Sequence, residues 1–342
     1  MLKTPAHYRP GLDLVRLAAL LPVLCYHFCI EAARSGFAVP AALIGRGMAD
    51  WVEVGLAWFF LLSGAALCLQ WQGRFAWRPY LAGRAAAMYP AFWLGFAVLF
   101  LYGEVLHGNN PDVPRWRVVF SVLGLDGYLA PLTATFYKIG EWFLGVILLL
   151  YLVFPLLLWC MDARARRRGL LAAMLLLQLA WPVVCPAPLE AGHTVLGRLP
   201  AFALGVWFGM RLRAGSGFAP RQKTALAAAA LACLALLPWT PDALRLAVLL
   251  ALAAALFWAV YALGQRLPQR SWGVLRRAAG WSYGVYLVHH VLLTLVLLPA
   301  AGRAGAPLAV WFPVFLLASF ALAAVLTALA APLARALRRL AA

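Results

Sequence analysis

The chain has 342 residues, of which 65% are hydrophobic and only 12% are charged, and its formal net charge is +18. Soluble domains are closer to half apolar and a quarter charged, so this composition excludes an ordinary soluble protein and predicts one that crosses a membrane several times. The positive charge could suggest a nucleic-acid partner. The basic residues, however, occur in short clusters between apolar stretches, as in cytoplasmic loops, and we therefore expect no nucleic acid.

Window hydropathy predicts an all-α fold with about ten transmembrane helices. The candidate spans are 12–30, 52–70, 85–102, 141–161, 169–186, 198–213, 224–240, 244–264, 281–300 and 309–331. No separate soluble segment and no fixed-period repeat is visible in the sequence. We therefore expect one membrane domain over residues 1–342, surrounded by lipid.

The Lys and Arg residues predict the orientation of these spans. With the N-terminus in the cytoplasm, 21 of the 29 Lys and Arg residues fall on the cytoplasmic side, including an arginine-rich loop at 164–168 and a basic loop at 266–277. This asymmetry favours an N-in, C-in topology. An additional span within 103–140 would place the 164–168 loop outside, so we expect 103–140 to be an external loop with a short surface or re-entrant helix.

The six cysteines lie almost entirely in apolar segments, and their spacing does not match a metal site. A buried cysteine without such a partner behaves as a small hydrophobic residue. We therefore expect the cysteines to be small buried hydrophobic residues, and we expect no bound metal.

The stretch 9–28 combines charged residues with an apolar helix. Asp13 and Arg16 are three residues apart, so they share one helix face and can form an ion pair. His27 lies about 16 Å beyond Arg16 along a helix, near the middle of an apolar core about 30 Å thick. An ionisable side chain at that depth predicts a functional site, and a hydrogen bond between packed helices is the alternative.

Six short blocks follow one another over nearly the whole chain. They are Leu12-Asp13 through Arg16 to His27, Gly55 to Gly64 with its Phe-Phe-Leu-Leu-Ser-Gly ending, Arg84 through Tyr89-Pro90, Glu141-Trp142 through Tyr151 to Pro155, Arg198 to Gly205, and Trp281 through Tyr283 and Tyr286 to His289. Together, and in this order, they resemble the blocks of the membrane-bound acyltransferase-3 family, whose members move an acyl group, often acetyl, onto cell-envelope sugars.

Two positions depart from the family pattern. Ala87 stands where a second arginine is common, and Ile147 stands where many members have a glutamate. Either an anion site that is built differently or a divergent branch of the family would explain both departures.

The resemblance implies that His27 is the catalytic base, since acyl transfer to a hydroxyl needs a base and histidine titrates near neutral pH. It also implies that Arg16 and Arg84 face the phosphates of a coenzyme A thioester, because guanidinium groups match phosphate geometry. Asp13 would then position Arg16. A plain ion pair at the cytoplasmic end of the helix is the alternative for Asp13 and Arg16.

Four further residues are candidates for substrate binding. His289 lies about 12 Å into its span, at a depth similar to that of His27, and could orient the substrate or assist proton transfer; a packed hydrogen bond is the alternative. Glu141 and Lys138 could contact the acceptor at the external end of their span, or form a solvated pair. Tyr283 could bind substrate or simply pack between helices.

With these observations, the resemblance implies a multi-pass O-acyltransferase of a bacterial inner membrane. Acyl-CoA, with acetyl-CoA favoured, would enter from the cytoplasm near Arg16 and Arg84. A hydroxyl of an envelope glycan or lipid-linked sugar would enter from outside, with 103–140 at its mouth. Ser63 is less favoured as a nucleophile because no base partner is visible. The alternatives are an exporter or flippase without chemistry and a membrane sensor or scaffold. The sequence gives no oligomeric state.

Overall fold

A computed structural model describes residues 8–108, 110–215, 218–305 and 307–339. Within these ranges the chain forms helices and no strand, and ten helical segments are long and apolar enough to cross a membrane. The helices in these segments are α1 Pro10–Arg34, α2 Arg46–Trp71, α3 Trp77–Phe100, α6 Glu141–Asp162, α7 Arg164–Val184, α8 Val195–Arg213, α9 Pro220–Leu236, α10 Asp242–Gln265, α11 Gln269–Leu292 and α13 Leu308–Arg339. The predicted all-α, ten-span architecture is confirmed.

Shorter helices join or extend these segments. They are η1 Ala41–Leu43, η2 Leu101–Leu106, η3 Arg115–Arg117, α4 Val118–Leu123, α5 Asp126–Leu129, η4 Ala191–His193, η5 Leu237–Trp239, η6 Leu293–Leu297 and α12 Leu298–Ala304. The six cysteines are free; Cys29 and Cys68 are buried, as predicted, whereas the other four are only partly buried.

Two basic clusters that we expected in loops lie on helices instead. Residues 164–168 belong to the first turns of α7, and most of the 266–277 cluster belongs to α11, which begins at Gln269. The expectation of loops at these positions was wrong. Long arginine side chains can extend toward the membrane surface while their backbone remains helical, so a helix need not end where the charge begins.

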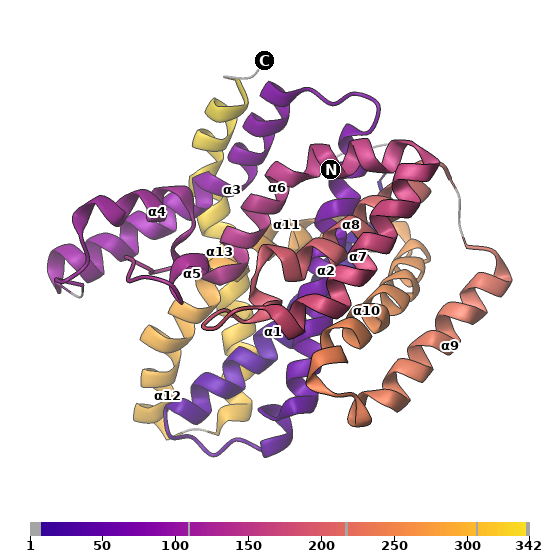
Figure 1. Ribbon diagram of the computed structural model, residues 1–342. Helices are drawn as coiled ribbons and strands as arrows, with labels where there is room; N and C mark the ends of the chain where they lie inside the picture. Colours follow the sequence, from indigo (N-terminus) through magenta and orange to yellow (C-terminus); the bar gives the residue numbers. More distant parts are fainter. Residues whose placement is uncertain (1–7, 109, 216–217, 306, 340–342) are drawn as a thin grey trace.

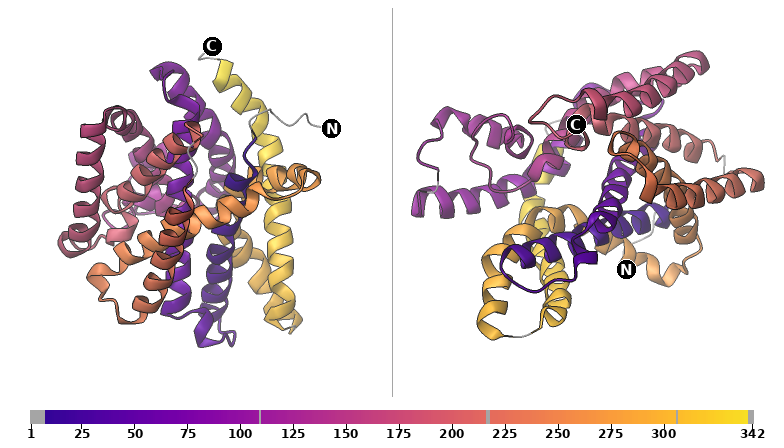
Figure 2. Two further views of the ribbon diagram at one scale, coloured as in Figure 1. Left: turned by 90° about the vertical axis from the view of Figure 1, so that its right-hand side faces the viewer. Right: turned by 60° about the horizontal axis from the view of Figure 1, so that its bottom comes forward.

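The segment 103–140 contains no additional span in its described part. Its first residues extend α3 as η2, so the expected loop begins later than we predicted. Beyond η2 the chain forms η3, α4 and α5, which are the short helices expected there. In Figure 1 and Figure 2, α4 and the last turns of α3 project from the side of the bundle, whereas α5 lies against it.

The centre of the bundle is built from α1, α2, α8 and α11. In the span windows of α2 and α8, 61% of the residues are buried, against 6% in α7 and α9, which lie at the periphery. Figure 1 shows α9 at the outer edge, separated from α1 by α10. The central helices therefore carry the site, and the outer ones face the surroundings.

Glycines allow the central helices to approach closely. A Cβ added at Gly205 of α8 would lie well inside 3.0 Å of the Leu61 carbonyl oxygen of α2, a separation that real Cβ atoms essentially never show. Gly64 of α2 meets the backbone of Phe202 in the same way. Small residues at such crossings let backbones pack against each other in membranes, where van der Waals contact is a main source of helix association.

We expect Gly205→Ala to destabilise the fold by about 1–3 kcal/mol, because the added methyl group must push α2 and α8 apart. The matched control is Gly273→Ala, since Gly273 is helical and has open space around it. That control should gain about 0.5–1 kcal/mol from reduced chain entropy. Thermal unfolding of both purified variants in one detergent measures the difference, and equal melting temperatures would contradict the close crossing.

Candidate active site

A cavity of about 680 Å³ runs through the centre of the bundle. Its lining residues come from α1, α2, α3, α6, α11 and the segment 190–193. Arg16 and Arg34 both line it and are 18 residues apart on α1, which corresponds to about 27 Å along the helix. The cavity therefore follows α1 over a length close to that of a bilayer core, about 30 Å.

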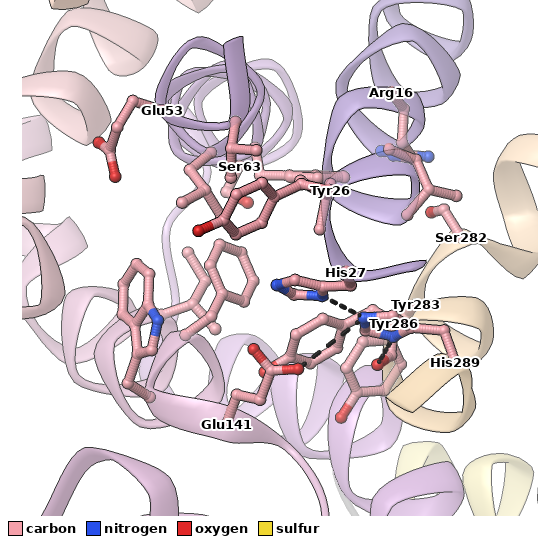
Figure 3. A pocket seen from close by; sticks show the side chains of 18 of the residues that line it. Arg16, Tyr26, His27, Glu53, Ser63, Glu141, Ser282, Tyr283, Tyr286 and His289 are labelled. Atoms are coloured by element: carbon pink, nitrogen blue, oxygen red, sulfur yellow. Dashed lines mark hydrogen bonds and ion pairs between the residues drawn. The ribbon is translucent and has the colours of Figure 1, made fainter. Parts of the chain in front are cut away.

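His27 projects from α1 into this cavity and contacts His289 of α11. Its Nδ1 atom is 2.8 Å from Nε2 of His289, and the two rings are stacked with their centroids 5.1 Å apart. Figure 3 shows the dashed line between these nitrogens and the second ring nitrogen of His27 directed away from His289. The sequence placed the two histidines at similar depths, and the structure brings them into direct contact.

The hydrogen bonds of His289 define which nitrogen of His27 carries a proton. Nδ1 of the fully buried His289 is 2.7 Å from the Tyr286 carbonyl oxygen, which can only accept, so this nitrogen donates. With both rings neutral, Nε2 of His289 is then the acceptor and Nδ1–H of His27 the donor. The lone pair of His27 is left on Nε2, the nitrogen that faces the cavity.

Glu141 is the first residue of α6 and stands in an unusual backbone conformation. Its φ is +36°, and the preceding Gly140 has a φ of +97°. Positive φ is uncommon for residues other than glycine and is concentrated at functional sites. The Tyr286 hydroxyl donates to the Gly140 carbonyl, and Gly127 of α5 packs directly on the backbone of Glu141. Two neighbouring elements thus hold the residue in place.

The Glu141 carboxylate faces the histidines rather than a loop lysine. Its Oε1 atom is 3.4 Å from Nε2 of His290 and 3.9 Å from Nε2 of His289. The solvated pair with Lys138 that we considered does not form. Lys138 pairs with Glu104 of η2, both side chains being mostly buried, and it is not among the residues that line the cavity.

His290 joins the group although sequence reasoning passed over it. Its ring centroid is 4.2 Å from that of His27 and 4.8 Å from that of His289. Successive residues of a helix point in different directions, so a neighbour of His289 was not expected to reach the same site. The available signal was the second ionisable residue in an apolar span.

Near the start of α1 the predicted ion pair between Asp13 and Arg16 is present. Arg16 lies 3.4 Å from Asp13, which also accepts a hydrogen bond of 2.8 Å from the Tyr8 hydroxyl. Arg16 lines the cavity, whereas Arg84 does not and lies with its guanidinium 5.6 Å from the ring centroid of Tyr151, a lining residue. The structure therefore brings only one of the two predicted arginines to the cavity wall.

The two positions that depart from the family pattern, Ala87 and Ile147, both line the cavity. With Met88 they form an apolar stretch of its wall where charged side chains could have stood. Ser63 also lines the cavity. Tyr283 lines the cavity as well, and its hydroxyl donates to the Met88 carbonyl at 3.0 Å.

A buried ion pair and a stacked aromatic pair were not anticipated from the sequence. Arg198, with only 2% of its side chain exposed, pairs with Glu53 at 2.9 Å, and Glu53 lines the cavity. The guanidinium of Arg198 lies 5.2 Å from the ring centroid of Trp142. The Trp142 ring in turn stacks on the ring of His193, with their centroids 4.2 Å apart. Burial and the nearby Arg198 lower the pKa of His193 to about 4, so this ring is neutral at pH 7.

These residues form a recognisable chemical arrangement. An oriented neutral imidazole has its lone pair toward a cavity, a second imidazole holds it from behind, and a carboxylate lies close by. This is the geometry expected of a general base with an orienting partner. An arginine lies along the wall on one side of the base, and a set of polar and aromatic side chains lies on the other.

The comparison with protein families gives a match. The family model described as an acyltransferase domain, that of the acyltransferase-3 family, matches residues 9–328. Neither the curated proteins nor the solved structures give a match. The matched range contains every residue of the histidine and glutamate group and the whole of the cavity lining.

Asp126, the first residue of α5, is buried, and its carboxyl allows a test of how this helix packs. Burial raises the pKa of its carboxyl from an ordinary value of 3.8 to about 6, against the opposing effects of the Ser121 hydroxyl and the Lys138 ammonium. Between these two values the folded state holds more protons than the unfolded state, so the contribution of Asp126 to stability falls as the pH rises through 6 and stays low above it.

We therefore expect Asp126→Asn to stabilise the protein by about 1–3 kcal/mol at pH 8, and by progressively less as the pH approaches 4. Melting temperatures of the purified variant and wild type across this pH range measure the effect. Asp112→Asn, at an exposed position, is the matched control and should leave the melting curve unchanged. A pH-independent gain, or a loss at pH 8, would contradict the role of the buried carboxylate.

Proposed function

The chain belongs to the acyltransferase-3 family and is a membrane acyltransferase, and we propose that it moves an acyl group, acetyl in the first instance, from acyl-CoA to a hydroxyl of an envelope glycan or lipid-linked sugar. In this proposal it lies in the inner membrane of a bacterial cell with both termini in the cytoplasm. His27 is the general base of the reaction. Membership of an enzyme family sets aside the exporter and sensor alternatives.

The observation that carries the proposal is the single cavity lined by Arg16, His27 and Arg34. His27 lies 11 residues from Arg16 and seven from Arg34, about 16 Å and 10 Å along α1. With the N-terminus inside, acyl-CoA approaches from the Arg16 side, where a guanidinium can bind phosphate. The acceptor approaches from the side of Glu53 and His193, whose polar groups can hydrogen-bond to a sugar.

The thioester and the acceptor hydroxyl would meet at His27. Nε2 of His27 takes the hydroxyl proton as the oxygen attacks the thioester carbonyl, the C–O bond forms, and the C–S bond breaks. The leaving thiolate then receives the proton from the His27 imidazolium, so no net proton is left on the enzyme. Fixing both reactants in one cavity replaces a bimolecular encounter by a positioned one. The apolar wall at Ala87, Met88 and Ile147 suits the acyl chain and its uncharged linker.

His289 and Glu141 support the base in this scheme. His289 fixes the tautomer of His27 through the 2.8 Å hydrogen bond, so that the lone pair faces the substrate. The carboxylate of Glu141 provides the negative charge that stabilises the transient imidazolium. Both are positioning residues, since they act through His27.

We expect His27→Ala to lower thioester turnover by about 10²–10⁴-fold, the usual contribution of a positioned general base. Purified protein in lipid is supplied with acetyl-CoA and a crude envelope-glycan extract, and release of the free thiol is followed. The matched control is His107→Ala, since His107 is an exposed histidine outside the cavity.

Release that needs the extract, survives in the control and disappears in His27→Ala supports the proposal. Release that is the same in wild type and His27→Ala would remove His27 from the chemistry. No release with acetyl-CoA or with longer acyl-CoAs, over several extracts, would contradict the proposed donor.

His289→Phe removes the hydrogen-bond acceptor behind His27, and we expect it to lower kcat by about tenfold or more with little change in the KM for acyl-CoA. The position of the acid limb of the pH–rate profile should change as well, because the neighbour of the base has changed. His289→Gln retains an acceptor oxygen and should restore part of the rate. Equal losses in both variants, with an unchanged pH profile, would indicate a purely structural role.

A further inference from the structure

Four side chains that can bind a metal ion converge at the wall of the cavity. His27, Glu141, His289 and His290 each offer one ligand atom, and these atoms lie within 4.8 Å of one another. The separations between neighbouring atoms are 2.8, 3.4 and 3.9 Å. Ligands of a tetrahedral ion with bonds of 2.0–2.1 Å are roughly 3.3 Å apart, so the observed distances bracket those of an occupied site.

The surroundings of these residues also suit a metal ion. The non-ligating Nδ1 of His289 donates to the Tyr286 carbonyl, which is the outer hydrogen bond that metal-bound histidines commonly make. Glu141 is held rigidly at the start of α6, and its carboxylate supplies a negative charge among the uncharged rings. Three of the four residues line the cavity and the fourth, His290, is 32% exposed, so an ion has a path to them.

We propose that the His27–Glu141–His289–His290 cluster binds one divalent transition-metal ion, and that Zn²⁺ is the ion it fits best. Three imidazole nitrogens and one carboxylate oxygen in a tetrahedral arrangement are typical zinc ligands. The residues come from three helices and are separated by more than 100 positions at each step except the last, so sequence spacing gave no indication of the site.

Metal binding has a direct consequence for His27, one that rests on its proposed role as the base. His27 presents Nδ1 to the centre of the cluster. Coordination through Nδ1 of a neutral ring places its proton on Nε2, and the lone pair needed to accept a proton from the acceptor hydroxyl is then no longer available. Zn²⁺ at this site therefore inhibits acyl transfer, and the uninhibited enzyme is the metal-free form.

The test begins with binding, measured without reference to activity. The full chain in lipid nanodiscs is washed with chelator, titrated with Zn²⁺, freed of unbound metal and analysed by elemental mass spectrometry. Co²⁺ serves as a second probe through the visible absorption of its four-coordinate complexes. We expect one ion per chain. His290→Gln should weaken binding at least as much as the roughly 10–100-fold that loss of an outer supporting residue costs.

The matched control is His107→Gln, which alters an exposed histidine away from the cluster and should retain full binding. If His290→Gln is poorly folded, as judged by gel filtration, His290→Asn replaces it. Binding of one ion that is weakened by either cluster variant and kept by the control supports the site. No binding in wild type, or binding of equal affinity in the cluster variants, overturns it.

The second arm measures thioester turnover with and without Zn²⁺. Inhibition through this cluster is supported if wild-type turnover, measured first in chelator, falls as one ion binds. The His290→Gln variant, compared with its own uninhibited rate, should then need at least about tenfold more Zn²⁺ for the same fractional loss of turnover. Turnover that is unchanged or raised by the bound ion overturns inhibition. Zinc binding without any turnover in chelator would contradict the proposed acyl transfer but support the metal site. Turnover without zinc binding would contradict the metal site but support acyl transfer.

Discussion

The hydrogen bond between His27 and His289 is the interaction on which the rest of the site depends. A polar group within the apolar core of a membrane is costly unless it finds a partner. Each ring satisfies the other, and the chain of donors ends at the Tyr286 carbonyl. Because a carbonyl can only accept, this one backbone group determines the direction of both hydrogen bonds. The lone pair in the cavity is thus oriented by the backbone of α11.

Holding two helices at this distance requires the helices around them to be fixed as well. Glycines bring α8 onto α2 and α2 onto α1, where Gly55 meets the Ala19 carbonyl. The short helix α5 serves the same purpose on the other side, because Gly127 lets it reach the strained backbone of Glu141. The segment before α6, which spans no membrane in its described part, therefore contributes to the site by packing.

The sequence predicted the features that depend on local composition. Ten apolar spans and the similar depth of His27 and His289 follow from hydropathy and from the positions of these residues in their spans, and the structure contains the ten helices and a contact between the two histidines. The features that the sequence could not predict depend on the rotation of each helix about its axis and on which side chains meet in the folded chain. The pairing of Lys138 with Glu104 and the contact of His290 with His27 are of this kind. Arg84 lies about one turn before the lining residues Ala87 and Met88, on the same face of α3, and its position against the Tyr151 ring is likewise a tertiary contact.

The proposed base and the proposed metal site both need the one basic lone pair of the neutral His27 ring. A general base needs a neutral imidazole with a nearby carboxylate to stabilise the imidazolium that forms. A zinc site needs neutral imidazoles and a carboxylate that offsets part of the charge of the ion. Three of the four side chains of the cluster, His27, His289 and Glu141, serve both purposes, because a transient proton and a metal ion are both cations stabilised by Glu141. Proton acceptance and metal binding are therefore mutually exclusive at His27, so any residue that tunes one of them tunes the other.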